Sequence, residues 1–413
     1  MLDVDAIRSR FPALRRVQDG RAVVFADAPG GSQLPDSVIG AVSGHLARGV
    51  SNEHGAFSTS RETDELIRAG REAAADLVGA EPSEIVFGPN ATSLLFAISR
   101  SVSRTLGPND EVVVTGLDHD ANVRPWVIAA QEAGASVRYV EFEPEDVTLD
   151  VTLLEHALSE RTKLVAFTLA SNAVGTIPPA AQLVQRSHEA GALVVVDGVH
   201  LAQHASLDLH GLGADIVACS LYKVFGPHIG LLAVRRELLE RWVPFKLRPA
   251  PDESPQRWET GTQNHEGIAG LVAAVDYIAE LGDAFGAPDG PNRRERVLAG
   301  YRVIAEHERS LATRFLDGIN EQQGISLWGI QDSARVAERT PTFAVRRRQE
   351  NPAETAGELA EHGIFVWDGD FYAIELMERL GLSETGGALR IGFCHYNTED
   401  EVDRVVEALV GET

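Results

Sequence analysis

Short, continuous apolar runs alternate with helical patterns between about residue 80 and residue 235. The runs are rich in β-branched residues and lack polar alternation, which is typical of parallel strands buried on both faces. Between them, apolar residues recur on one helical face, as at Leu94, Leu95, Ile98 and Val102. This pattern predicts βαβ units and a mainly parallel sheet, hence an α/β fold. The expected strands lie within 84–88, 110–116, 163–171, 192–200 and 215–220, with a further strand running into a helix from 230.

The chain changes character after a segment rich in Gly, Pro and Asp at 281–296, which predicts an exposed loop near a domain boundary. A long amphipathic helix is expected over 297–319. A closing helix begins at Thr398 and carries Glu401 three positions later, a capping-box pattern. Between the two helices, strand-like pieces lie within 325–330, 340–346, 363–369 and 388–393.

Two domains are the default for a chain of 413 residues. We predict a large α/β domain over 21–285 and a smaller α+β domain that combines 1–20 with 286–413. The packing of the first twenty residues onto the smaller domain rests on weaker signals than the rest.

The excess of acidic over basic residues restricts the partners that the protein can bind. The formal net charge is −24, with 37 Lys and Arg against 61 Asp and Glu, which argues against nucleic acid or an anionic membrane as a partner. No apolar run approaches the length of a membrane span. The acidic beginning of the chain does not resemble a signal peptide, so a cytoplasmic location is expected. The two cysteines, Cys219 and Cys394, have no metal-ligand spacing, and no metal is expected.

Lys223 and Asp197 are the first candidates for chemistry. Lys223 comes a few residues after a predicted buried strand, where α/β sheets bind ligands. A neutral amine there could form a Schiff base with a carbonyl cofactor, although a lone lysine is far more often exposed and inert. Asp197 ends the preceding strand and needs a partner such as a protonated pyridine nitrogen, or else caps a turn before Gly198. On successive strands, the two can face one crevice.

Three further strand ends carry candidate binding groups. After the strand at 84–88, Ala91, Thr92 and Ser93 could offer a hydroxyl and helix N-terminal N–H groups to a phosphate. The alternative is a simple N-cap by Asn90, Thr92 or Ser93. His119 could stack on a flat heteroaromatic ring, and Asn172 could supply an amide; a loop histidine and an Asx turn are the ordinary alternatives. Each signal is weak alone, but their order along one chain is specific.

Taken together, "DHDANVRPW", "SNAVGTIPP", "VVVDGVH", "CSLYKVFGPHIG", "RWETGTQNHEGIAGL" and "ALRIGFCHYNT" resemble the class V aminotransferase superfamily of fold-type I pyridoxal-phosphate enzymes, and most closely its cysteine desulfurase-like branch. The resemblance covers nearly the whole chain. It implies the fold-type I architecture, pyridoxal 5'-phosphate as cofactor, an amino-acid substrate and a homodimer with shared sites.

The resemblance also implies roles by position. Lys223 corresponds to the internal aldimine lysine, Asp197 to the partner of the pyridine nitrogen and His119 to the stacking histidine. Arg390 corresponds to the arginine that binds the substrate α-carboxylate, a task that suits a planar guanidinium. The further correspondences are Asn172 and His200 near the cofactor's ring oxygen, Ala91, Thr92 and Ser220 at its phosphate, and Thr262 at the phosphate of the neighbouring subunit.

One departure from the family pattern bears on the reaction. Desulfurases carry a catalytic cysteine on a loop before the last helix–strand unit, and here that stretch reads "FVWDGDFYAIELMERLG". By register Tyr372 takes the cysteine's position, within a slip of one or two residues. Cys219 and Cys394 lie elsewhere and are expected in the core. Persulfide formation on that loop is therefore not expected.

The expected activity is that of a lyase acting through an external aldimine, by α,β-elimination that includes C–S bond cleavage among its candidate reactions. Tyr372 serves as an acid to the leaving group or, more in keeping with its type, as a pocket wall. The alternatives are an epimerase, a class V aminotransferase and a non-catalytic protein that binds pyridoxal phosphate. A nucleotide-binding α/β protein is disfavoured because no glycine-rich phosphate fingerprint is present.

Overall fold

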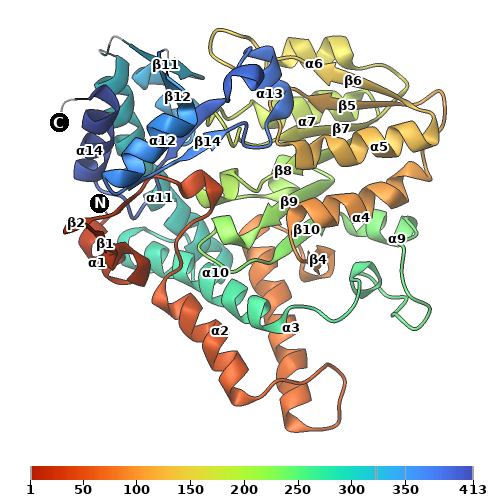
Figure 1. The fold of residues 1–413 in the computed structure, drawn as a ribbon. Helices are drawn as coiled ribbons and strands as arrows, with labels where there is room; N and C mark the ends of the chain where they lie inside the picture. The colour runs from red at the N-terminus through yellow and green to blue at the C-terminus, as the bar shows by residue number, and fades with distance from the viewer. Residues whose placement is uncertain (1, 321, 323, 349, 412–413) are drawn as a thin grey trace.

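A seven-stranded sheet forms the centre of the computed structural model, which describes residues 2–320, 322, 324–348 and 350–411 (Figure 1). Its strand order is β4-β10-β9-β8-β7-β5-β6. The strands are β4 (Ile85–Gly88), β5 (Glu111–Thr115), β6 (Ser136–Val140), β7 (Thr162–Thr168), β8 (Leu193–Asp197), β9 (Ile216–Ser220) and β10 (Gly230–Val234). Neighbouring strands from β9 to β6 are parallel, so the predicted α/β fold with a mainly parallel sheet is confirmed.

The direction of β10 differs from the rest of the sheet. It runs antiparallel to both β9 and β4. Only residues 221–229 connect β9 to β10. A parallel connection needs a crossover of a dozen or more residues, so this short link can only reverse the chain. It also carries Lys223, which the reversal holds at the sheet edge where the parallel strands end.

Helices cover this sheet and extend beyond it. Apolar residues of α4, α5 and the sheet, among them Leu95, Trp126, Val114 and Val195, form one core cluster. The helices before residue 286 are α1 (Val4–Ser9), α2 (Asp36–Arg48), α3 (Ser58–Val78), α4 (Ala91–Ser103), α5 (Arg124–Ala133), α6 (Val151–Ala157), α7 (Ala180–Glu189), α8 (Leu209–Leu212), α9 (Arg236–Arg241) and α10 (His265–Phe285). Helices α2 and α3 project from the body (Figure 1).

The C-terminal part is built on a four-stranded antiparallel sheet of order β11-β12-β15-β14. Its elements are α11 (Arg293–Asn320), β11 (Ile325–Trp328), β12 (Thr342–Arg347), α12 (Pro352–Glu361), β13 (Ile364–Phe365), β14 (Trp367–Gly369), α13 (Ile374–Arg379), β15 (Ala388–Gly392) and α14 (Glu399–Val410). The expected loop at 281–296 is shorter than predicted, because α10 continues to Phe285 and α11 already begins at Arg293. The predicted capping box is present: Thr398 Oγ1 accepts from the Glu401 N–H at 3.1 Å.

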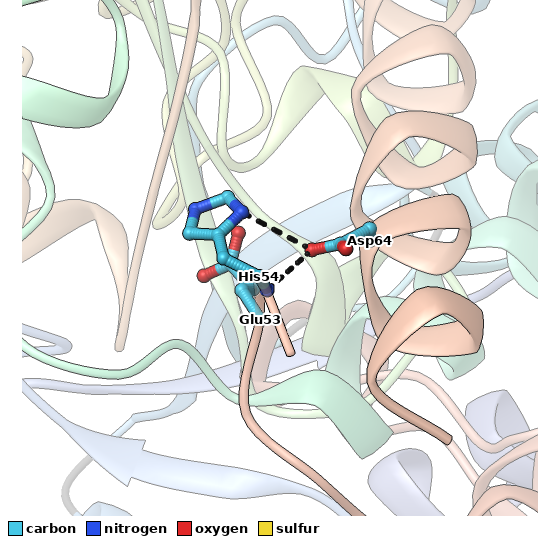
Figure 2. Close-up of side chains that lie close together, drawn as sticks. All are labelled: Glu53, His54 and Asp64. Carbon is cyan, nitrogen blue, oxygen red and sulfur yellow. Dashed lines mark hydrogen bonds and ion pairs between the residues drawn. The ribbon is translucent and has the colours of Figure 1, made fainter. Parts of the chain in front are cut away.

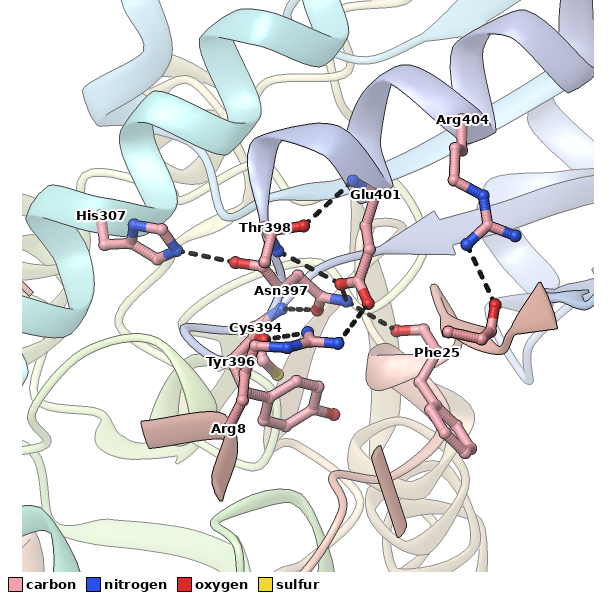
Figure 3. A network of polar contacts seen from close by, with 10 residues as sticks. Arg8, Phe25, His307, Cys394, Tyr396, Asn397, Thr398, Glu401 and Arg404 are labelled. Atoms are coloured by element: carbon pink, nitrogen blue, oxygen red, sulfur yellow. Dashed lines mark hydrogen bonds and ion pairs between the residues drawn. The ribbon is translucent and has the colours of Figure 1, made fainter. Parts of the chain in front are cut away.

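The N-terminal segment packs against the C-terminal part (Figure 3). Arg8 donates to the Tyr396 carbonyl at 2.7 Å and pairs with Glu401 at 2.8 Å. The Asn397 amide donates to Glu401 at 2.9 Å and to the Phe25 carbonyl at 3.3 Å. Strands β1 (Val17–Gln18) and β2 (Arg21–Ala22) form a hairpin, and β3 (Val24–Phe25) pairs in parallel with β13.

The same segment also contacts the large sheet's helices, since Arg10 pairs with Glu280 of α10 at 2.7 Å. The domain limits at 20/21 and 285/286 stay a prediction. No helix in the described part of the chain combines the length and the apolar character that crossing a membrane requires.

Candidate active site

A cavity of about 650 Å³ lies at the carboxyl ends of the parallel strands, where α/β sheets bind ligands. It gathers side chains from β7 and β8, from the N-terminus of α4, from the loop after β5 and from the β9–β10 link. Most of the predicted site residues line it, namely Ala91, Thr92, His119, Asn172, Asp197, His200, Ser220, Lys223 and Tyr372.

Lys223 is buried in this cavity, with 5% of its surface exposed. It ends a short 3₁₀ turn over Leu221–Lys223, which closes where the Val224 N–H donates to the Leu221 carbonyl at 2.8 Å. The Leu221 N–H donates to the Ile229 carbonyl at 2.9 Å and so joins the two ends of the β9–β10 link. Burial, together with the charge of Arg390, lowers the pKa of Lys223 to about 7 against the opposing effect of Asp197. Much of the amine is therefore neutral near pH 7 and can act as a nucleophile or a base.

Asp197 is the last residue of β8 and is 5% exposed. One carboxylate oxygen accepts from the Val199 N–H at 2.8 Å. Burial raises the pKa of Asp197, while this hydrogen bond and the charge of Lys223 lower it. Since the carboxylate lines the cavity, it can hold a cationic ring nitrogen of a bound ligand.

His119 follows β5 and faces the same cavity. Its Nδ1 accepts from the Ala121 N–H at 3.0 Å, which leaves Nε2 to carry the proton of the neutral ring. Burial, with the charges of Lys223 and Arg390, lowers the pKa of His119 to about 3. The imidazole is therefore uncharged, as ring stacking requires. The ring that it faces in the structure belongs to Tyr372, with 5.4 Å between centroids and 17° between planes.

The start of α4 forms the opposite end of the cavity. Asn90 caps the helix by accepting from the Ser93 N–H at 2.8 Å, so the simple capping interpretation holds for Asn90. The Ala91 N–H donates to Ser220 Oγ at 2.9 Å, which joins the helix start to the end of β9. A side chain at Gly230 would overlap the Asn90 backbone, so glycine allows this close approach. A helix N-terminus with hydroxyls beside it can hold a phosphate.

Asn172 and His200 are engaged by the protein itself. The Asn172 amide donates to the Phe371 carbonyl at 2.9 Å. His200 Nε2 lies 3.0 Å from Thr342 Oγ1 and 3.3 Å from Thr340 Oγ1. Among the described residues, Asn172 Oδ1 and His200 Nδ1 are buried without a hydrogen-bond partner. Their expected place near the cofactor's ring oxygen stays a prediction.

Arg390 and Thr262 do not line the cavity of their own chain. Arg390, on β15, is buried: it donates to the Asn172 carbonyl at 3.1 Å, and its guanidinium lies 4.5 Å from the centre of the Phe371 ring. Its charge still acts on the cavity through Lys223. Thr262 is exposed in the loop before α10. That it reaches the site of a second subunit stays a prediction.

Tyr372 stands at the cavity mouth with 69% of its surface exposed. Phe371 and Tyr372 both adopt left-handed backbone conformations, with φ of 57° and 56°, which non-glycine residues rarely do. Hydrogen bonds hold them there: Tyr372 N–H donates to Asp370 at 2.9 Å, and the Asp120 N–H donates to the Tyr372 carbonyl at 2.7 Å. The loop that bears Tyr372 is thus attached to the loop that bears His119.

Both cysteines are fully buried, each with 0% of its surface exposed. Burial raises the pKa of Cys219 to about 12 and also raises the pKa of Cys394. Their thiols are therefore protonated and shielded, as expected for core residues.

Sequence reasoning missed a stacked pair that also lines the cavity. The rings of Tyr222 and His228 lie 5.2 Å apart and nearly parallel, at 5°. Both belong to the β9–β10 link, and the signal available was only their proximity to Lys223 in "LYKVFGPH". Phe96, Asp120 and Arg124 also line the cavity, although no sequence signal pointed to them.

A possible cation cluster lies away from the cavity. Glu53, His54 and Asp64 offer ligand atoms within 4.8 Å of one another (Figure 2). His54 is 80% exposed and lies 3.5 Å from Asp64. Exposed clusters of this kind are common without a metal, so it supports no metal site, and the expectation that the protein needs no metal stays a prediction.

The cavity's groups suit pyridoxal 5'-phosphate as a set. A neutral buried amine can bind its aldehyde, a buried carboxylate its ring nitrogen, an uncharged imidazole its ring face and a helix N-terminus its phosphate. The unpartnered polar atoms of Asn172 and His200 lie in the wall beside them.

Comparisons with known proteins support the same assignment. The model of the family described as aminotransferase class-V matches residues 24–286 and 297–405. A cysteine desulfurase of Klebsiella pneumoniae is 30% identical, over 98% of this chain and 97% of that protein. A probable cysteine desulfurase 2 of Mycobacterium leprae is 33% identical, over 99% and 96%. The apo structure of a cysteine desulfurase from Thermococcus onnurineus superposes with a TM-score of 0.88 at 26% identity, over 100% and 99% of the two chains.

Proposed function

Because the chain belongs to the aminotransferase class V family and is a pyridoxal-phosphate-dependent enzyme, we propose that it is a lyase that acts on an amino acid by α,β-elimination, with C–S bond cleavage as its candidate reaction. The proposal rests on one observation: a buried amine of lowered pKa lies in a cavity whose accessible surface includes no cysteine among the described residues. The sequence has a tyrosine, not a cysteine, on the loop beside it.

Pyridoxal phosphate, when bound, would supply an electron sink for the α carbon of an amino-acid substrate. Lys223 Nζ would accept the α-proton. Asp197 holds the ring nitrogen in its cationic form. The substituent on the β carbon then leaves with the bonding electron pair, and after hydrolysis the products are a 2-oxo acid, ammonia and the protonated leaving group.

The other site residues hold the reactants in place. His119 stacks on the ring, while Ala91, Thr92 and Ser220 bind the phosphate and Asn172 and His200 lie near the ring oxygen. Arg390 binds the substrate carboxylate from its buried position beside Asn172 and the Phe371 ring. Tyr372 forms a wall of the pocket.

Sulfur transfer through a persulfide is not part of this proposal. Such a step needs an accessible thiolate, whereas Cys219 and Cys394 are buried and their pKa values are raised. A sulfur substituent would therefore leave the site as a free thiol or sulfide.

Spectroscopy of the purified enzyme tests the assignment. We expect a visible band that borohydride bleaches, a cofactor adduct on the peptide containing Lys223, and no such adduct in Lys223→Ala. Incubation with cysteine and S-alkylcysteines should release thiol or sulfide, ammonia and 2-oxo acid in equal amounts.

Other outcomes would identify the alternatives. Racemised substrate without ammonia would indicate an epimerase, and conversion of the cofactor to its amine form would indicate an aminotransferase. A spectrum that responds to none of the amino acids would indicate a non-catalytic binding protein.

We also propose a cytoplasmic homodimer in which Thr262 contacts the phosphate of the neighbouring subunit. The exposure of Thr262 outside its own cavity is compatible with this role. Light scattering gives the oligomeric state, and Thr262→Val should weaken cofactor retention without changing that state.

A further inference from the structure

A second cavity, of about 530 Å³, adjoins the first. Tyr222 and His228 line both cavities, so their stacked rings form the partition between them. Beyond this partition the wall is mainly apolar and comes from α2, the loop before it and β14. It includes Leu34, Ile39, Val42, Leu46, Pro227 and Trp367.

Close packing fixes one side of this second cavity. A side chain at Gly30 would overlap the indole of Trp367, so the loop and the ring lie in direct contact. Ser32 N–H donates to the Tyr222 carbonyl at 3.0 Å, and Ser32 Oγ accepts from the Phe225 N–H at 2.8 Å. The loop before α2 is therefore joined to the link that carries Lys223, and the partition is formed without a ligand.

Arg390 is buried close to residues of both cavities, although it lines neither. It donates to the carbonyl of Asn172, which lines the first cavity, and its charge acts on Asp27 and Tyr222, which line the second. Asp27 Oδ1 is buried without a hydrogen-bond partner among the described residues. A substrate in the first cavity would lie against Tyr222 and His228, which also line the second cavity.

We propose that the second cavity receives the side chain of the substrate, and that the substrate class is therefore amino acids with an extended apolar side chain, such as long S-alkyl thioethers. This rests on the proposed function, because it takes the first cavity as the site of the α-amine. The apolar wall has solvent-facing members, Ile39 at 46% and Leu46 at 52% exposed, which an apolar side chain would cover.

The proposal predicts a dependence of affinity on chain length. Burying one methylene is worth about 0.8 kcal/mol, or about a fourfold gain in affinity per added carbon. Titration of the holoenzyme's visible band with alanine, 2-aminobutyrate, norvaline and norleucine measures this directly, since these ligands bind without needing a leaving group. Affinity should rise at each step by about that factor.

A charged side chain in the lining of the second cavity should abolish the gain in affinity with chain length. In Leu46→Asp the carboxylate faces the apolar side chain, so the gain per carbon should disappear while alanine binds as before. Val50→Asp is the matched control, because Val50 is 57% exposed near α2 but does not line the cavity. Trp367→Ala, which removes the wall from the other side, should weaken norleucine binding more than alanine binding.

The measurements distinguish a failure of this inference from a failure of the proposed function. Amino acids that alter the visible band with no dependence on chain length overturn this inference and leave the proposed function intact. An unresponsive band overturns both. A change of oligomeric state in Leu46→Asp but not in Val50→Asp, seen by light scattering, shows that a second copy covers α2 and overturns the assignment to substrate.

Discussion

The rings of His119 and Tyr372 lie 17° from parallel with their centroids 5.4 Å apart, although the two residues are far apart in the sequence. The hydrogen bond from the Asp120 N–H to the Tyr372 carbonyl fixes this pairing at the backbone. Tyr372 is thus part of the wall of the candidate active site in this structure, and its loop cannot move without disturbing the loop of His119.

Tyr372 is expected to act through its ring rather than its hydroxyl. Tyr372→Phe retains the ring, so turnover and the visible spectrum should change little. Tyr372→Ala removes the ring and should raise KM and alter the cofactor band. A loss of about a hundredfold or more in kcat for Tyr372→Phe, confined to the chemical step, would instead identify the hydroxyl as the acid to the leaving group.

The charge of Asp197 is expected to matter for turnover rather than for folding. Asparagine can still accept the Val199 N–H, so Asp197→Asn should fold and retain the cofactor. Without the carboxylate the ring nitrogen loses its proton, and kcat should fall by about a hundredfold. Asp120→Asn, at the same cavity, is the control and should leave kcat little changed. Equal effects of both substitutions would contradict the assignment.

The buried Lys223 should give the apoenzyme a characteristic pH dependence. Its pKa is about 7 when folded against 10.5 as the ordinary value, so between these limits the unfolded chain binds more protons. The free energy of unfolding should therefore rise with pH in this window, by at most about 1.4 kcal/mol per pH unit, and this contribution should be constant below pH 7.

Lys223→Met isolates the effect, since it removes the titrating amine and retains an unbranched chain of similar length. The difference in urea-unfolding free energy between apo wild type and apo Lys223→Met should narrow as pH rises from 7 to 10. A difference that does not depend on pH would show that the amine is charged in the folded protein.

The contact between Arg8 and Glu401 should contribute measurably to stability. Arg8 also donates to the Tyr396 carbonyl, and the Glu401 side chain is only 9% exposed (Figure 3). Arg8→Met removes both contacts, leaves Glu401 with only its neutral donors Asn397 and Thr398, and should lower the free energy of unfolding by about 1–3 kcal/mol. Arg68→Met, which breaks an exposed pair with Glu72, should change it by less than about 0.5 kcal/mol in urea denaturation.

The buried strands could be predicted from sequence because each presents an unbroken apolar run. β6 (Ser136–Val140) escaped this reasoning, since it lies at the sheet edge and only Val140 is buried. The reversed direction of β10 depends on the length of the link before it rather than on its composition.

The cavity itself was predictable to the extent that its residues follow strand ends. The contact of Arg390 with the Phe371 ring could not be predicted, because it depends on the pairing of β14 with β15 and not on a local pattern. The second cavity is lined by Gly30, Leu46 and Trp367, and no local sequence pattern predicts that these three residues lie together.

The parallel pairing of Val24 with Ile364 has a consequence for synthesis on the ribosome. The first strand of this pair emerges long before its partner exists, so β3 must wait unpaired while the large sheet assembles. The loop of Tyr372 follows β13 closely, so the pocket wall and the anchoring of the chain's beginning are completed in the same final stage of translation.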